Sequence, residues 1–311
     1  MIPRYGILST SSIAPRFIAG VRQAQAGEIV ALSSRTLQKA EEKAKLWGIP
    51  KAYGSHEALL NDPDIDIVYI STVNALHYPW AKAALEHGKH VVCEKPCTTS
   101  EADTRELFRL AREKGLFLME AEKMLFLPAV QMLRQKLEEG ALGEVRMVRL
   151  SHSFPASYNG WMFDKAAGGG TLLSSGIYAV QLILHLFGEI RQLQGCFDRD
   201  ENGAEHQYVL SGQTQSGVLF SIHNSSCVPL DNTACFYGEN GWAELPEYWK
   251  ARKVTFHTEG ETKTLEFPCE HELMYEAAHI KACLDKGLTV SPVVTEKLSR
   301  DGIAALESLL K

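Results

Sequence analysis

The residues best suited to chemistry in this chain are Glu94 and Lys95, which stand directly before a proline. They follow a short apolar run at 90–93 and precede a helix that we expect to begin near Ser100. A lysine at the carboxyl end of a buried strand faces the crevice in which open α/β sheets bind ligands. Burial lowers a lysine's pKa readily, so a lysine in such a place can hold an anion or take part in proton transfer. The pattern predicts a functional lysine, although Glu-Lys-Pro also occurs in ordinary loops.

The turn after the first predicted strand suits a phosphate group. In a dinucleotide-binding fold this turn places a pyrophosphate on the N-terminus of the next helix, against free N–H groups and the positive end of the helix dipole. The usual Gly-x-Gly-x-x-Gly/Ala pattern maps to Ser9, Ser11 and Ala14, so serine replaces glycine twice. The alternative is a serine-capped helix start that binds no ligand. We expect cofactor contacts from Ser9, Thr10, Ser11, Ser12 and Ile13.

Polar residues end the next two predicted strands. The second strand ends at Ser34 and Arg35, where an NAD site usually carries an acidic residue for the ribose 2′-hydroxyl. A small residue followed by arginine instead suits a 2′-phosphate, which predicts NADP rather than NAD; the alternative is a surface arginine that opens a helix. After the third strand, Thr72, Asn74 and His77 can line the nucleotide crevice, although His77 also fits a purely structural histidine.

Residues 1–121 carry the elements that would position these side chains. Short apolar strands alternate there with amphipathic helices, and glycines follow the helices where a helix C-terminus favours them. This alternation predicts a parallel, doubly wound sheet of the Rossmann type, with α/β class overall. The strands are expected at 4–8, 28–33, 66–71, 89–93 and 116–119.

The pattern changes after residue 121. Tight turns join strands in pairs there, which predicts a large, mostly antiparallel open sheet. The pairs are 207–214 with 218–224, 232–238 with 242–245, and 253–257 with 262–267, and helices are expected at 128–139 and 295–310. We therefore predict a nucleotide-binding domain at 1–121 and an α+β substrate-binding and dimerisation domain at 122–311.

Composition limits the class of protein. The 311 residues are 45% hydrophobic and 23% charged, as in ordinary globular proteins. A net charge of −6 without a basic stripe argues against nucleic acid or a membrane surface as partner. No apolar run reaches the about 18 residues of a membrane span, and no secretory signal is visible. The seven scattered cysteines, without a Cys-x-x-Cys pair, predict a reduced cytoplasmic protein without a metal site.

Together these motifs resemble the glucose–fructose oxidoreductase, inositol dehydrogenase and MocA family over nearly the whole chain. The Thr-x-Asn-x-x-His pattern at 72–77 and the Glu-Lys-Pro at 94–96 carry the resemblance. Within the family the chain is most similar to the dimeric dihydrodiol dehydrogenase branch, which includes NADP-dependent D-xylose dehydrogenases. The resemblance implies a Rossmann domain, and a homodimer formed through the C-terminal sheet. The matching stretches of that branch are 49–55, 118–121, 176–178 and 291–293.

The resemblance also implies a reaction centre. Tyr178 aligns with the tyrosine that relatives use as acid or base, and it lies on a predicted helix after the glycines at 168–170. A free phenol has a pKa near ~10, and a cation within about 4–6 Å would lower that pKa. We expect Lys95 and Tyr178 to be the catalytic pair beside the nicotinamide, with Glu94 contacting the cofactor. The alternative for Tyr178 is an aromatic residue packed at a domain boundary.

Substrate contacts are expected from Lys123, Trp161, Ser174 and Tyr178. Two positions depart from the family pattern. Relatives usually have aspartate where this chain has Ser174, and many dihydrodiol-type relatives have arginine where it has Leu125. Both departures lie where the resemblance implies that substrate is held.

The sequence thus predicts an NADP-dependent oxidoreductase that moves a hydride between nicotinamide and a carbon of a sugar, polyol or trans-dihydrodiol. NAD is the second choice of cofactor. Two other functions stay open at this point. One is redox-assisted lyase or glycosidase chemistry, in which the cofactor is regenerated in each turnover, and the other is an NADP-binding sensor with little turnover.

Overall fold

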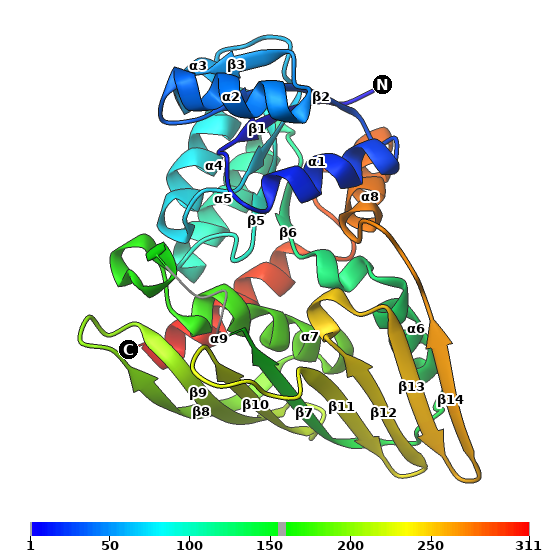
Figure 1. Ribbon diagram of the computed structural model, residues 1–311. Coiled ribbons are helices and arrows are strands. Elements are labelled where there is room, and N and C mark those ends of the chain that lie inside the picture. Colours follow the sequence, from blue (N-terminus) through cyan, green and yellow to red (C-terminus); the bar gives the residue numbers. More distant parts are fainter. Residues whose placement is uncertain (1, 155–159, 311) are drawn as a thin grey trace. The chain divides into compact units, whose positions relative to one another are not determined.

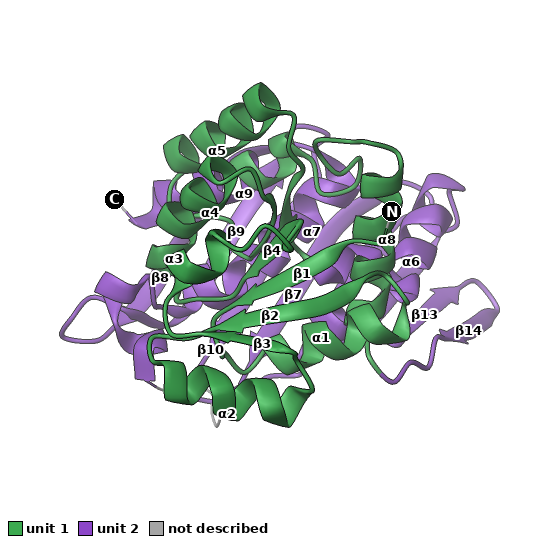
Figure 2. Ribbon diagram, turned by 90° about the horizontal axis from the view of Figure 1, so that it is seen from above, with its two compact units in different colours: residues 1–122, 271–300 green, residues 123–270, 301–311 purple. Residues whose placement is uncertain are grey.

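The computed structural model describes residues 2–154 and 160–310, which form two compact units (Figures 1 and 2). The first unit comprises residues 1–122 and 271–300, and the second comprises 123–270 and 301–311. The predicted domains were single continuous stretches, whereas each unit is built from two stretches of chain. Residues 271–300, near the C-terminus, thus pack with the N-terminal unit.

The first unit contains a six-stranded sheet in the order β3-β2-β1-β4-β5-β6, and all neighbouring strands pair in parallel. The order reverses at β1 and β4, because the chain builds β1 to β3 on one side and then β4 to β6 on the other. Open parallel sheets bind ligands at such a point. This confirms the predicted doubly wound sheet. The strands are β1 (Arg4–Leu8), β2 (Glu28–Ser33), β3 (Lys51–Tyr53), β4 (Ile67–Ile70), β5 (His90–Glu94) and β6 (Leu118–Ala121).

Helices cover both faces of this sheet because its strands are apolar on both sides. Val68 and Ile70 of β4 join a buried core with α3, α4 and α5, while the intervening Tyr69 points the other way and stacks on Phe17 of α1 at 3.7 Å. Gly48 and Gly115 end α2 and α5 with φ values of +62° and +66°, as the sequence predicts. The helices are α1 (Ala14–Gln23), α2 (Leu37–Trp47), α3 (His56–Leu60), α4 (His77–Glu86), α5 (Glu101–Lys114) and α8 (Leu273–Asp285).

The second unit contains an eight-stranded sheet in the order β14-β13-β12-β11-β7-β10-β9-β8. Among the described residues of this sheet, only β7 and β10 pair in parallel, so the mostly antiparallel sheet is confirmed, as are the three predicted hairpins. Strands β7 and β8 were not predicted. The sheet strands are β7 (Val145–Ser153), β8 (Ile190–Arg199), β9 (Glu205–Thr214), β10 (Leu219–Ser225), β11 (Thr233–Gly238), β12 (Gly241–Pro246), β13 (Lys253–Thr258) and β14 (Glu261–Glu266).

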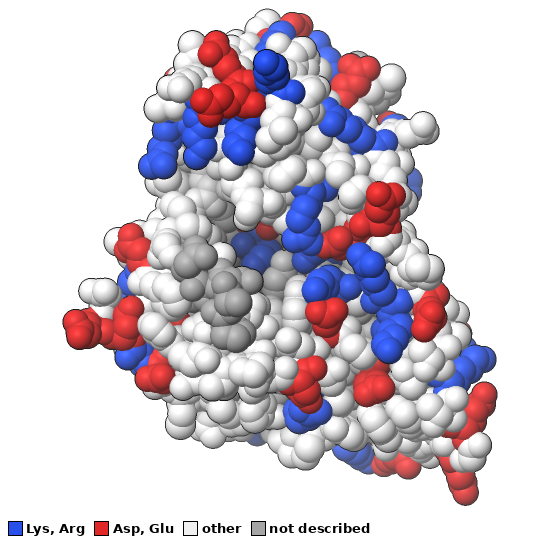
Figure 3. Space-filling view, viewed as in Figure 1, with Lys and Arg blue, Asp and Glu red and all other residues white. Residues whose placement is uncertain are grey.

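Helix α7 (Ile177–Phe187) is the central helix of the second unit, and a π-helical turn, η5 (Leu172–Gly176), precedes it. The segment 165–187 is long and apolar enough to cross a membrane, but 78% of the 18-residue apolar window within it is buried inside the structure, as in a core helix. Other helical segments of the chain are α6 (Pro128–Glu138), α9 (Glu296–Leu310) and the short turns η1 (Asn74–Leu76), η2 (Lys123–Phe126), η3 (Gly160–Phe163), η4 (Lys165–Ala167) and η6 (Tyr248–Lys250). On the face that Figure 3 displays, acidic and basic side chains are interspersed.

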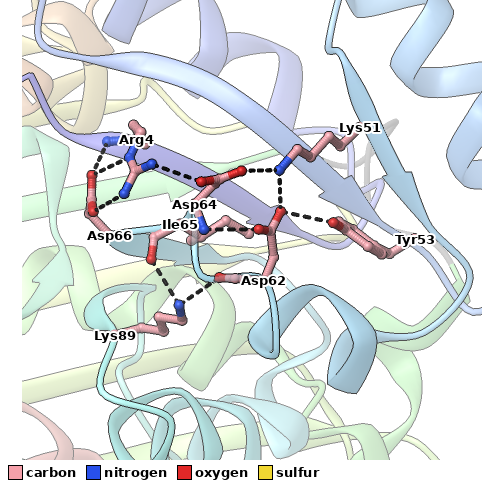
Figure 4. Close-up of polar contacts among 8 residues, drawn as sticks. All are labelled: Arg4, Lys51, Tyr53, Asp62, Asp64, Ile65, Asp66 and Lys89. Atoms are coloured by element: carbon pink, nitrogen blue, oxygen red, sulfur yellow. Dashed lines mark hydrogen bonds and ion pairs between the residues drawn. The ribbon is translucent and has the colours of Figure 1, made fainter.

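A polar network ties together the amino ends of the strands in the first unit (Figure 4). Lys51 bonds the carboxylates of Asp62 and Asp64 at 2.9 and 2.7 Å, and Arg4 pairs with Asp66 at 2.9 Å. The network lies at the opposite edge of the sheet from the strand ends that face a ligand. Its members are Arg4, Lys51, Tyr53, Asp62, Asp64, Ile65, Asp66 and Lys89.

Candidate functional site

The turn between β1 and α1 keeps the geometry of a phosphate-binding turn without its glycines. Ser9 has a φ of +110°, a conformation that favours glycine, and its N–H donates to the Ser33 carbonyl at 3.2 Å. Helix α1 begins at Ala14 after Ile13, and no side chain caps it. This argues against the alternative of a serine-capped helix start. The structure places Ser9, Thr10, Ser11, Ser12 and Ile13 together in this turn.

Ser11 joins this turn to the end of β4 across the point where strand order reverses. Its hydroxyl donates to the Ser71 hydroxyl at 2.8 Å rather than to the helix. The next residue, Thr72, has a buried hydroxyl without a hydrogen-bond partner in the part of the chain that the structure describes. Asn74 follows and is also buried. Small hydroxyl and amide groups therefore gather where a dinucleotide lies in this class of sheet.

The end of β2 carries an exposed arginine beside buried serines. Ser34 is buried, and the Ser33 hydroxyl contacts Nδ1 of His56 at 2.8 Å. Arg35 is exposed, and its guanidinium makes no hydrogen bond or ion pair within residues 2–154 and 160–310. Burial, and then the Arg35 charge, lower the pKa of His56. His56 lies more than twenty residues from this strand end in the sequence, so no local motif singled it out.

The His77 ring bridges the backbone segments that follow β4 and β5. Its buried ring contacts the Pro96 carbonyl through Nδ1 at 2.8 Å and the Thr72 carbonyl through Nε2 at 3.2 Å. Burial lowers the pKa of His77 despite these two carbonyls. Both ring nitrogens are thus engaged by backbone, which supports the structural alternative for His77 and makes its effect on a cofactor indirect.

Lys95 follows β5 and is surrounded by carboxylates of its own unit. Glu94 accepts a hydrogen bond from the Tyr69 hydroxyl at 2.5 Å, and buried Glu120 accepts one from the Cys97 N–H at 2.9 Å. Burial lowers the pKa of Lys95, while the charges of Glu94, Glu122 and Glu120 oppose that effect. A lysine with a lowered pKa can give and take a proton more readily at neutral pH.

In the second unit the structure brings Lys123 of η2 to Tyr178 of α7. The Lys123 ammonium donates to the Tyr178 hydroxyl oxygen at 3.2 Å and to the Trp249 carbonyl at 3.0 Å. The ammonium also lies 4.8 Å from the centre of the Tyr178 ring. Both residues are nearly buried, with 6% and 9% of their surface exposed. Sequence reasoning named both residues but did not predict this contact.

Aromatic rings surround this pair. His152 of β7 stacks on Trp249 with ring centres 3.6 Å apart, and its ring centre lies 6.4 Å from that of Tyr178. The Tyr248 ring is 5.9 Å from His152. Sequence reasoning missed His152 and Trp249, because β7 was not predicted and Trp249 takes part through its backbone carbonyl and its ring.

Of the other predicted substrate residues, Ser174 has a backbone partner. The Ser174 hydroxyl donates to the Gly170 carbonyl at 2.6 Å, and half-buried Trp161 lies in η3. The adjacent glycines permit close backbone packing, since a Cβ on Gly169 would lie 2.6 Å from the Trp161 carbonyl oxygen. The close approach that the glycines allow is thus to other parts of the same unit.

The residues of the first unit fit a nicotinamide dinucleotide. The glycine-like turn at Ser9, the helix start without a side-chain cap and the unpartnered Thr72 hydroxyl suit a pyrophosphate and a ribose. Within the described residues, no group of three or more His, Cys, Asp or Glu side chains is arranged to hold a metal ion.

Comparisons with known proteins agree with this geometry. Residues 4–122 match a family model described as an oxidoreductase family with an NAD-binding Rossmann fold, and residues 130–244 match a GFO/IDH/MocA C-terminal domain. The trans-1,2-dihydrobenzene-1,2-diol dehydrogenase of Mus musculus is 35% identical over 305 residues, which cover 94% of this chain and 92% of that protein.

Two solved structures share the fold. Levoglucosan dehydrogenase in complex with NADH and levoglucosan has a TM-score of 0.90 at 18% identity, over 99% of this chain and 96% of that one. A 3-ketoreductase from Actinomadura kijaniata in complex with NADP has a TM-score of 0.90 at 23% identity, over 99% and 97%. Because one neighbour holds NADH and the other NADP, the comparisons support a nicotinamide cofactor without selecting between the two.

Proposed function

Because the chain belongs to the GFO/IDH/MocA family of NAD(P)-binding oxidoreductases, we propose that it moves a hydride between NADP and a hydroxyl-bearing carbon of a sugar, polyol or trans-dihydrodiol. Membership makes the chain a dehydrogenase by class. The substrate class is supported by the 35% identity to trans-dihydrodiol dehydrogenase over 94% of the chain. The observation that carries the proposal is Lys95, whose pKa burial lowers at the ligand-facing edge of the nucleotide-binding sheet.

The preference for NADP rests on the end of β2. Position 34 is a buried serine where NAD sites carry a carboxylate, so no negative charge would repel a 2′-phosphate there. The exposed guanidinium of Arg35 can bind such a phosphate through two parallel hydrogen bonds. The cofactor, when bound, supplies the hydride acceptor or donor.

The protein's own residues then manage one proton and one developing charge. During oxidation the Tyr178 phenolate would take the proton as the substrate O–H bond breaks and become the neutral phenol, while the C–O double bond forms and the hydride leaves the carbon for the bound cofactor. Lys95 would stabilise the negative charge that grows on the substrate oxygen. During reduction the same proton returns from Tyr178. This sequence requires Lys95 and Tyr178 to meet at the substrate, which stays a prediction.

A panel of sugars, polyols and trans-dihydrodiols tests the function by the absorbance of reduced cofactor. On the best substrate, Tyr178→Phe should lower kcat by about 10²–10⁴, the usual range for a lost general acid or base. Lys95→Met should nearly abolish turnover. Both variants should keep the wild-type affinity for NADP's adenosine half, because neither side chain belongs to the turn after β1 or the end of β2.

Other outcomes of the same panel identify the alternatives. Product formation without net accumulation of reduced cofactor would support redox-assisted lyase or glycosidase chemistry. Tight NADP binding with no turnover on any compound would support a sensor. A wild-type kcat and pH profile in Tyr178→Phe would remove the tyrosine from the mechanism.

We also propose a homodimer formed through the eight-stranded sheet. Met147, Val209 and Leu219 are 50%, 48% and 49% exposed on the sheet. Met147 lies between Leu219 of β10 and Tyr237 of β11 in register, and Tyr237 lies opposite Trp242 of β12. Trp242, Tyr237, Met147 and Leu219 form one apolar row across the sheet, and Val209 lies outside that row, opposite His223. Such an exposed apolar row suits a second copy of the chain. A cytoplasmic location is proposed from the scattered cysteines alone.

A further inference from the structure

In the hydrogen bond between Lys123 and Tyr178, the chemistry of the two groups fixes which is the donor and which is the acceptor. An ammonium group can only donate hydrogen bonds, so the Tyr178 oxygen is the acceptor of the 3.2 Å contact. The phenol's own proton must therefore point away from Lys123. A hydroxyl that is held through its oxygen, with its proton turned elsewhere, is set to donate that proton to a third group.

The ammonium is itself held in place. It donates to the Trp249 carbonyl at 3.0 Å, and the Trp249 ring is stacked on His152. One N–H group of Lys123 thus bonds the backbone of η6, and another bonds the phenol. Because the side chain is only 6% exposed, its charge is poorly screened by water and acts strongly on its neighbour.

We infer that Lys123 is a positioning residue for Tyr178, which orients its hydroxyl and stabilises the phenolate formed when Tyr178 gives up its proton. This inference rests on the proposed function and deepens it. It changes the role expected for Lys123 from the sequence, because the ammonium addresses the acid–base group rather than the substrate. The cation that tunes Tyr178 then comes from the same unit as the tyrosine.

A general base works best when its pKa is near the working pH, and a nearby cation moves a phenol in that direction. Other ionisable groups stand on the surrounding elements. They are His152 of β7, Tyr248 and Lys250 of η6, Arg134 of α6 and His185 of α7. Lys250 pairs with Glu247 at 2.8 Å, and Arg134 pairs with Glu138 at 2.8 Å. Burial and then the Arg134 charge lower the pKa of His185 to about 4, well below the phenol's range.

The test is the pH dependence of kcat for substrate oxidation in four forms of the full-length protein. In the wild type, kcat should rise with pH as Tyr178 loses its proton. Lys123→Met should move the midpoint of that rise up by about 1 to 3 pH units and lower kcat at pH 7 in proportion. Lys123→Arg, which keeps the charge, should restore the midpoint at least in part, and Tyr178→Phe should lose the rise.

Lys250→Met is the matched control. It removes a lysine from the same unit whose ammonium lies 6.0 Å from the Trp249 ring and does not bond Tyr178. Its midpoint should equal that of the wild type. If Lys123→Met does not fold, Lys123→Gln replaces it with the same expected rise. A variant without the Lys123 charge that keeps the wild-type midpoint would overturn the inference.

A second readout does not require activity. Tyrosinate absorbs at longer wavelength than neutral tyrosine, so the absorbance titration of the wild type minus that of Tyr178→Phe reports Tyr178 alone. This difference should titrate at higher pH in the Lys123→Met background. If no compound is turned over, the proposed function fails while this titration still decides the inference. An unchanged titration in an active enzyme would reject the inference and leave the function standing.

Discussion

Arg35 is the exposed side chain on which the proposed preference for NADP depends. It follows two serines at the end of β2, and its guanidinium has no partner within the described residues. Because no ion pair has to be broken first, the Arg35 guanidinium can bind a ligand phosphate without that energetic cost. The neighbouring Ser33 is engaged by His56 at 2.8 Å, so this edge of the site is already ordered around the strand end.

Arg35→Ala should weaken NADP by about 10- to 100-fold, because one charge-assisted contact contributes roughly 1.5–3 kcal/mol. NAD, which lacks the 2′-phosphate, should bind almost as before. Calorimetric titration of both cofactors measures the two affinities. Lys39→Ala, which removes an exposed cation from α2, the helix that follows Arg35, is the control and should change neither. Equal losses for NADP and NAD in Arg35→Ala would contradict the assignment.

At the scale of elements, the polar network in Figure 4 joins β1, β3 and the segment before β4. Burial by itself raises the pKa of Asp62, but hydrogen bonds from Lys51, the Asp64 amide and Tyr53 lower it overall. Bonding to Lys51 lowers the pKa of Asp64, and bonding to Arg4 lowers that of Asp66. A carboxyl with a lowered folded pKa stabilises the fold above its unfolded pKa of ~3.9, and this stabilisation is lost as pH falls through the folded pKa.

Asp62→Asn should therefore lower the free energy of unfolding at pH 7 by about 1–3 kcal/mol, as expected for a lost buried charge-assisted bond. The wild type should lose stability as pH falls below about 4, and the variant should lose less over that range. Urea denaturation at pH 7 and at pH 3 measures both effects. Asp64→Asn, at an exposed carboxylate, should have a smaller effect, and neither variant should alter NADP affinity. Parallel loss of stability in wild type and Asp62→Asn would show that Asp62 has no part in acid unfolding.

At the scale of the whole molecule, the proposed dimer depends on the exposed apolar row on the eight-stranded sheet. The apolar row described above continues to His257, which stacks on Trp242 with ring centres 3.9 Å apart. Stable protein interfaces bury about 1,600 Å² in total, and a broad sheet face can supply such an area. In the proposed two-fold dimer, each copy would present the same row to the other.

Light scattering at micromolar concentration should give about twice the 34.5 kDa mass of one chain. Met147→Glu, which places a charge in the middle of the row, should yield a monomer that still binds NADP. Val228→Glu changes an exposed apolar residue outside the strands and should remain dimeric. A monomeric wild type would refute the dimer, and a dimeric Met147→Glu would move the interface to another surface.

The features that the sequence by itself determined are those that depend on neighbours along the chain. Alternation of apolar runs and amphipathic helices predicted the parallel sheet, because burial on both faces requires strands like 67–70 to be apolar throughout. The turn at Asn240 and Gly241 and the helix ends at Gly48 and Gly115 depend on local backbone preferences. The motif at Lys95 indicated the ligand-facing edge of the sheet, because it directly follows an apolar run in the sequence.

Only the tertiary structure determined which residues that are distant in the sequence come into contact. Strand β3 has only three residues, all half-buried, and buried and exposed residues do not alternate regularly along β7. Neither strand therefore has a clear sequence pattern, and each is recognised only by its pairing with neighbouring strands. Lys123 lies 55 residues from Tyr178 and 126 from Trp249, and no local pattern relates them. Contacts of this kind depend on how a whole unit packs. For this reason Tyr178 and Lys123 could be predicted from the sequence as site residues, whereas their contact could be found only in the folded structure.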